Sequence, residues 1–115
     1  MYSFLVMYYV LHQIYFQCNE NDLGGFLGMI SPELRSDGKP MDYAVFNDWR
    51  NFFHKGVAEV PQYSDIYGFL ELYEKEFNFV FSLTKKQLLN NIEYNMLENA
   101  CKWAQRFCLE HENWE

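Results

Sequence analysis

Cys101, Cys108 and His111 come closest, by type and spacing, to a metal site. They stand at i, i+7 and i+10, so one helix face could carry all three side chains. Tetrahedral zinc needs a fourth ligand, and the chain has no paired short-spacing Cys or His motif to supply it. We therefore interpret both thiols as small residues on the packing side of a helix, and we expect neither a metal nor a cofactor.

Cys18 could form a catalytic pair with His12 or His54, but no local signature supports a nucleophile there. The sequence also lacks G-x-S-x-G, a phosphate-binding loop and H-E-x-x-H. Three cysteines without framework spacing favour free thiols in a reducing compartment. These features predict a protein that is not an enzyme.

Four aspartates recur in residues 22–49, a stretch rich in Gly and Pro: Asp22, Asp37, Asp42 and Asp48. A catalytic carboxylate pair would need one pKa raised by burial. We expect Asp22 and Asp42 to be helix N-caps, Asp37-Gly38 to be a turn, and Asp48 to face water. The alternative is a small helical ligand-binding domain or enzyme that uses the 22–49 loop. A deep pocket with converging carboxylates and exposed Gly backbone would favour that alternative.

Hydrophobic spacing predicts an all-α fold, a single compact bundle of about four to six helices forming one domain over residues 1–115. For 2–18, which is apolar on most sides, a strand is the alternative. A break near Asn90–Asn95 and extended structure at Phe77–Phe81 also stay open. The expected helices are 2–18, a short turn at 23–28, 43–55 with Gly56 as its stop, one from an N-cap at Ser64 to about 81, and one from a Thr84–Gln87 capping box to about 110.

The predicted helices are joined by a packed Gly- and Pro-containing connection at residues 19–41. Gly24 and Gly25 permit close backbone approach or positive φ, and Ser31-Pro32 can start a single turn. Apolar residues persist among these breakers, which is not typical of a linker. The stretch is therefore expected to position helices rather than to perform chemistry.

The chain has 16 acidic and 9 basic residues, a formal net charge of −7. This balance argues against direct nucleic-acid binding and suits a basic protein partner, although acidity can also serve solubility alone. Acidic and aromatic residues are interleaved after Ser64, where the alternative is an ordinary solvated helix face. The candidate partner-binding residues are Asp65, Tyr67, Glu71, Glu74 and Glu76.

The apolar run Phe4–Leu11 is too short to cross a bilayer, which takes about 20 apolar residues. The first basic residue is Arg35 and no small-residue cleavage site follows the run, so a signal peptide is not expected. We expect a cytoplasmic protein without a membrane partner.

The pattern of residues 22–49 resembles a group of small all-helical bacterial proteins. It reads Asp22-Leu-Gly-Gly-Phe-Leu-Gly28, then Asp37-Gly38, then Pro40-Met-Asp42, and finally Phe46-Asn-Asp-Trp49. Such proteins look like immunity proteins of contact-dependent or polymorphic toxin systems. The resemblance implies a 1:1 complex with a cognate toxin, a basic nuclease domain and often a tRNase. It also implies a scaffold role for Asp22, Gly24, Gly25, Gly28, Asp37, Gly38, Asp42 and Trp49. An obligate homodimer is a further alternative.

Overall fold

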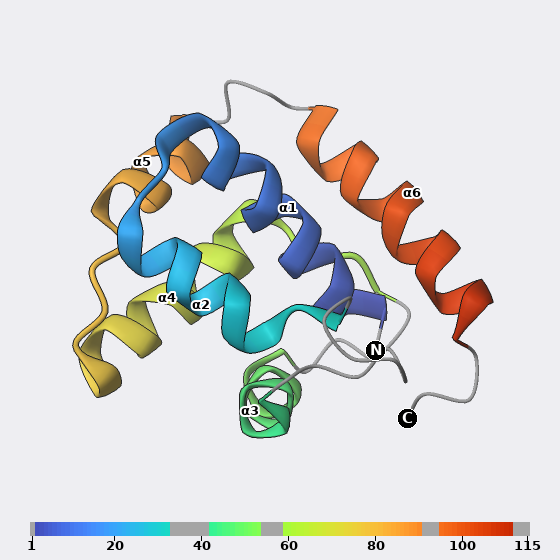
Figure 1. Ribbon diagram of the computed structural model, residues 1–115, viewed down its shortest axis with the longest axis horizontal. Helices are drawn as coiled ribbons and strands as arrows, with labels where there is room; N and C mark the ends of the chain where they lie inside the picture. Colours follow the sequence, from blue (N-terminus) through green and yellow to red (C-terminus); the bar gives the residue numbers. More distant parts are fainter. Residues whose placement is uncertain (1, 33–41, 54–58, 91–94, 112–115) are drawn as a thin grey trace.

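Helix α1, Tyr2–Cys18, lies at the centre of the computed structural model, which describes residues 2–32, 42–53, 59–90 and 95–111 (Figure 1). Residues 3–11 are buried without interruption, and Ile14 is buried as well. A helix that is apolar all round has to be covered on every side. The prediction of a helix at 2–18 is confirmed, and the strand alternative is wrong.

Five further helices surround α1, and no strand occurs in the described residues, so the predicted all-α class is confirmed. Helix α6 packs along α1 over much of its length, while α2, α3 and α5 also contact α1, and α4 packs on α5 (Figure 1). The five helices are α2 Asn21–Ile30, α3 Tyr43–Phe52, α4 Tyr63–Phe77, α5 Ser82–Asn90 and α6 Asn95–Glu110.

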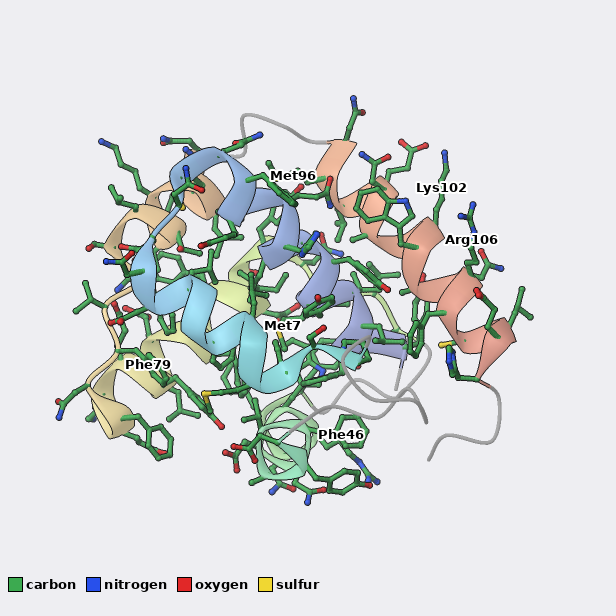
Figure 2. The ribbon with its side chains drawn as sticks, viewed as in Figure 1. Met7, Phe46, Phe79, Met96, Lys102 and Arg106 are labelled. Carbon is green, nitrogen blue, oxygen red and sulfur yellow. The ribbon has the colours of Figure 1, made fainter. Side chains whose placement is uncertain are left out.

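The core between these helices is unusually aromatic (Figure 2). Phe4 and Phe46 meet edge to face with ring centroids 5.1 Å apart, and Trp49 meets Phe69 in the same way at 5.1 Å. Such pairs add about 0.5–1.5 kcal/mol beyond the burial of their area. Most of the chain's aromatic surplus in the described residues therefore stabilises the core.

Two predicted helices end earlier than their hydrophobic stripes. Helix α4 ends at Phe77 because Asn78 takes the left-handed conformation, with φ 59° and ψ 25°, which stops a helix. Phe77 and Val80 are consequently exposed, while Phe81 returns to the core. The extended alternative for this stretch is thus the one observed.

The long C-terminal helix is divided into α5 and α6, as the break alternative near Asn90–Asn95 predicted. The Thr84–Gln87 capping box is wrong, because Thr84 lies inside α5 and is fully buried. Likewise, α3 ends at Phe52, before the predicted residue 55. Gly56 lies outside the described residues.

Asp22 is not the predicted N-cap. Helix α2 begins at Asn21 with Glu20 as its N-cap residue, so the expected short turn is a helix of 10 residues. The Asp22 carboxylate instead accepts a hydrogen bond of 2.7 Å from the backbone N–H of Val80. Glu20 accepts from the backbone N–H groups of Leu83 and Thr84 at 3.0 and 2.9 Å, and from the Thr84 hydroxyl at 2.7 Å. The two carboxylates tie α2 to the start of α5.

The glycines of α2 divide into two kinds. A Cβ on Gly24 would lie 2.9 Å from the Tyr15 ring, so the predicted close approach is confirmed there. Added to Gly25 or Gly28, a Cβ would meet nothing within 4 Å, and neither residue has positive φ. The expectation that Gly25 is required by close packing or by positive φ is therefore wrong within this chain.

The remaining motif residues behave partly as predicted. The Asp42 carboxylate accepts a 3.0 Å hydrogen bond from Ala44 N and caps α3, which confirms that N-cap. Trp49 is buried, and its indole N–H donates to Ser3 Oγ over 3.0 Å. Residues 33–41, which include the predicted Asp37-Gly38 turn, lie outside the described part of the chain.

Candidate functional site

Helix α4 carries the five residues predicted to bind a partner. Three of them, Asp65, Tyr67 and Glu74, make contacts within the fold. Its N-cap is Gln62 rather than the predicted Ser64. Asp65 accepts a 2.8 Å hydrogen bond from the Gln62 N–H and so closes the first turn of the helix. The Asp65 carboxylate is therefore used to cap α4.

Glu74 and Tyr67 share one cation, Lys85 of α5. The Lys85 ammonium lies 2.6 Å from Glu74 Oε1 and 5.3 Å from the centroid of the Tyr67 ring. The other Glu74 oxygen accepts a 2.8 Å hydrogen bond from Phe81 N. Its hydrogen bond to Glu74 raises the pKa of Lys85, although burial acts in the opposite direction. Glu74 therefore joins α4 to α5 instead of lying open on an outer face.

Glu71 and Glu76 are the two predicted residues whose carboxylates remain available. Glu71 is more than half exposed and only 3.9 Å from Lys85, which Glu74 already pairs more closely. Glu76 is exposed and has no ion pair among the described residues. The exposed Lys75 offsets one of these two charges.

Large apolar side chains are exposed where α4 passes into α5. The exposed fractions are 54% for Phe77, 55% for Val80 and 51% for Leu83. Glu76 immediately precedes the first of them, and Glu71 lies earlier on the same helix. We call these five residues the α4-end surface. Exposed apolar groups with charged neighbours are typical of an interaction patch. Its apolar members were not among the predicted binding residues, because hydrophobic spacing placed Phe77 and Val80 on the buried stripe of the helix.

The α4-end surface is held on a rigid support. Tyr73 of α4 donates a 2.5 Å hydrogen bond to the Asp48 carboxylate of α3, and its ring lies 4.8 Å from that of Phe77. Burial and this hydrogen bond both raise the pKa of Tyr73. Asp48 therefore does not simply face water, as predicted; it anchors α3 to α4.

The glycine-rich face of α2 lines a shallow cleft of about 390 Å³. Gly24, Gly25 and Gly28 form one wall, and His12 and Phe16 lie opposite on α1. Among the described residues, no carboxylate lines this cleft. In the described part of 22–49, the ligand-binding alternative thus has exposed Gly backbone without the converging carboxylates that it requires.

Cys18, Cys101 and Cys108 are free thiols, and the described residues contain no cluster of three potential metal ligands. Burial, with a hydrogen bond to Cys101, raises the pKa of Tyr2 to about 12, and burial raises the pKa of Cys108. Raised thiol pKa values disfavour the reactive thiolate. Cys18 contacts Thr84 rather than His12, and His54 lies outside the described residues.

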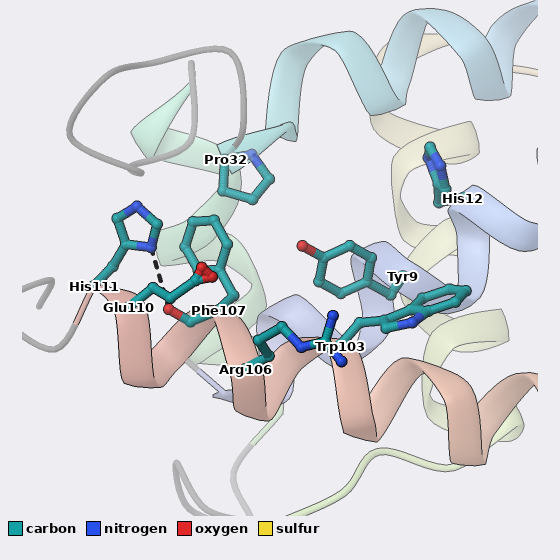
Figure 3. Close-up of a pocket in the computed structure, with 8 residues that line it drawn as sticks. All are labelled: Tyr9, His12, Pro32, Trp103, Arg106, Phe107, Glu110 and His111. Carbon is teal, nitrogen blue, oxygen red and sulfur yellow. Dashed lines mark hydrogen bonds between the residues drawn. The ribbon is translucent and has the colours of Figure 1, made fainter.

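A second cleft lies between α6 and the end of α2, with α1 as its floor (Figure 3). Its volume is about 540 Å³, and Tyr9, Trp103, Arg106 and Phe107 are among its lining residues. None of these was singled out as a site residue from the sequence, because the cleft exists only where three helices meet. The sequence feature that could have indicated it is Arg106, which stands between Trp103 and Phe107 on the same helix.

None of the helices in the described ranges has both the length and the apolar character needed to cross a membrane. Comparison with protein-family models, with curated proteins and with solved structures gives no match to this chain.

Proposed function

We propose that this protein is a non-enzymatic immunity protein, which binds a cognate toxin and blocks the toxin's active site. The observation that carries the proposal is the α4-end surface, where three apolar side chains at least half exposed follow the exposed Glu76, and the exposed Glu71 lies earlier on α4. Apolar anchors supply most of the affinity of an interface, while charges around them select the partner and guide encounter.

The partner that fits this surface is a basic protein domain, such as a nuclease or tRNase toxin. A nuclease binds its phosphate substrate with Lys and Arg, and those residues would meet the carboxylates of the α4-end surface. The net charge of −7 would favour the same encounter at long range. Inhibition then follows from occlusion and needs no catalytic group on this chain. A 1:1 complex in the cytoplasm is the expected arrangement.

The proposal is tested by co-expressing the chain with the product of the adjacent upstream gene, followed by affinity purification and an RNase assay. We expect a stable complex in which the nuclease is inactive. If the neighbouring product neither co-purifies nor shows toxicity that this chain relieves, the proposal is wrong.

A double variant that reverses one charge and replaces one exposed apolar side chain locates the binding face. The double variant Glu76→Lys/Val80→Ser is expected to weaken binding at least about 100-fold, the equivalent of about 2.7 kcal/mol. Its matched control is Glu59→Lys/Leu89→Ser, which makes the same chemical changes at exposed positions elsewhere. Equal losses in both variants would show that total charge, rather than the α4-end surface, determines binding.

A further inference from the structure

We propose that the cleft over α1 between α2 and α6, named here the Arg106 cleft, binds a small aromatic monocarboxylate. This inference concerns a different face from the α4-end surface and does not depend on a toxin partner. Four features carry it: size, aromatic lining, an available cation and a carboxylate that limits the ligand's charge.

The cleft has the size and lining of a small-molecule site. Its volume of about 540 Å³ lies within the range of about 300–1,000 Å³ that is usual for such sites. Tyr9 lies on its floor and meets Trp103 edge to face, with ring centroids 5.8 Å apart. At the far end, His111 stacks on Phe107 at 4.1 Å, and its Nδ1 lies 3.2 Å from the Phe107 carbonyl oxygen. These contacts hold the ring faces in place before a ligand arrives.

Arg106 is the cation available to a ligand in the Arg106 cleft. It projects from α6 on the side of Trp103 and Tyr9 (Figure 3). No carboxylate lies within ion-pair distance of Arg106 in the described part of the chain, whereas Lys102, one turn earlier, is paired with Glu98 at 3.4 Å. A guanidinium binds a carboxylate with two parallel hydrogen bonds and also stacks on aromatic rings.

Glu110 limits the negative charge that a ligand in the Arg106 cleft can carry. It lines the same cleft one turn after Arg106, so the formal charges of these two described lining residues cancel. A dianion such as phosphate would be repelled by Glu110 after pairing with Arg106. A monocarboxylate can place its charge at Arg106 and its ring against Trp103, which lines the cleft and is 37% exposed. The cleft therefore favours an aryl carboxylate over phosphate.

The test is a titration of the full chain with 1-naphthoate, monitored by two-dimensional amide NMR. Parallel titrations use 1-naphthalenemethanol, which is its neutral counterpart, and inorganic phosphate. We expect shifts in α6 and around Tyr9, with naphthoate binding about tenfold more tightly than the alcohol and phosphate causing no shifts there. No naphthoate binding at millimolar concentration, equal binding of the alcohol, or tighter binding of phosphate would each overturn the proposal.

Two variants assign the carboxylate contact. Arg106→Gln removes the cation from an exposed position, so the fold should persist, and naphthoate affinity should fall at least about tenfold to the level of the alcohol. Lys102→Gln, outside the cleft, should leave affinity within about twofold. An unchanged affinity in Arg106→Gln contradicts the assignment. A short peptide ending in Phe serves as a last arm; binding tenfold tighter than naphthoate would show that the occupant is a peptide, and that the small-molecule proposal is wrong.

Discussion

Carboxylates have opposite roles at two neighbouring parts of the molecule. Where α2 meets the start of α5, Glu20 and Asp22 together accept four hydrogen bonds, one from Val80 before α5 and three from Leu83 and Thr84 in its first turn. At the α4-end surface, Glu76 is exposed to solvent and has no ion pair among the described residues. The formal charge counts both kinds equally. Only exposed carboxylates with no partner or a weak one, such as Glu76 and Glu71, are available to bind another protein, so the acidic composition overstates the interaction surface.

The largest expected effect comes from Glu20→Ala, which removes three hydrogen bonds at the N-terminus of α5. Because the buried Thr84 then loses its charged acceptor, we expect the free energy of unfolding to fall by about 3 kcal/mol. Urea denaturation measures this change. The matched control, Glu71→Ala, should cost less than about 0.5 kcal/mol. Equal costs for the two variants would remove the distinction between internal and available carboxylates.

Tyr73→Phe tests the anchor below the α4-end surface. The loss of the hydrogen bond to Asp48 should cost about 2 kcal/mol at pH 7. The pKa of Tyr73 is raised in the folded state, so above its unfolded value of about 10 the unfolded chain loses this proton first. The contribution of Tyr73 to the free energy of unfolding is therefore fully present below about pH 10. Above that pH it falls by up to about 1.4 kcal/mol per pH unit.

The Phe variant should show a shallower alkaline decline than the parent chain. Denaturant titrations between pH 9 and about 11 provide the comparison. An alkaline decline of the same slope in both proteins would contradict the raised pKa of Tyr73. The decline that should remain in the variant comes from other groups with raised pKa values, which are Tyr2, Tyr63, Cys108 and Lys85.

Gly→Ala variants in α2 should change the free energy of unfolding least, and the sign of the change should depend on the position. Gly25→Ala and Gly28→Ala should each raise the free energy of unfolding by about 0.5–1 kcal/mol, since both positions are open and Ala is the better helix former. Gly24→Ala should gain less or lose stability, because the Tyr15 ring must move away. Thermal unfolding of the three variants measures the order. The same gain at Gly24 as at Gly25 would mean that Tyr15 does not restrict position 24.

The sequence predicts what is decided locally. Helix α1 follows from an apolar run, the core positions of α3 follow from helical spacing, and the Asp42 cap needs only the N–H of Ala44, two residues on. The end of α4 stayed open between a helix to about 81 and extended structure from Phe77, because hydrophobic spacing does not reveal that Asn78 adopts positive φ.

The surfaces could not be predicted because they depend on contacts between distant residues. Glu20 and Thr84 are 64 residues apart, and nothing near either one indicates the partner. Composition suggested that Glu74 was an outward charge, whereas the fold gives it both Lys85 and Phe81 N as partners. In the same way, the Arg106 cleft needs α1, α2 and α6 to meet before Tyr9 and Arg106 become neighbours.

The central claim is that the α4-end surface binds a basic protein toxin, and its most direct test is an affinity measurement. The product of the adjacent upstream gene, which we expect to be the toxin, is titrated against the parent chain, Glu76→Lys/Val80→Ser and the control Glu59→Lys/Leu89→Ser. We predict a loss of at least about 100-fold for the first variant and less than about threefold for the control. Full affinity in Glu76→Lys/Val80→Ser, with the fold intact, would contradict the claim.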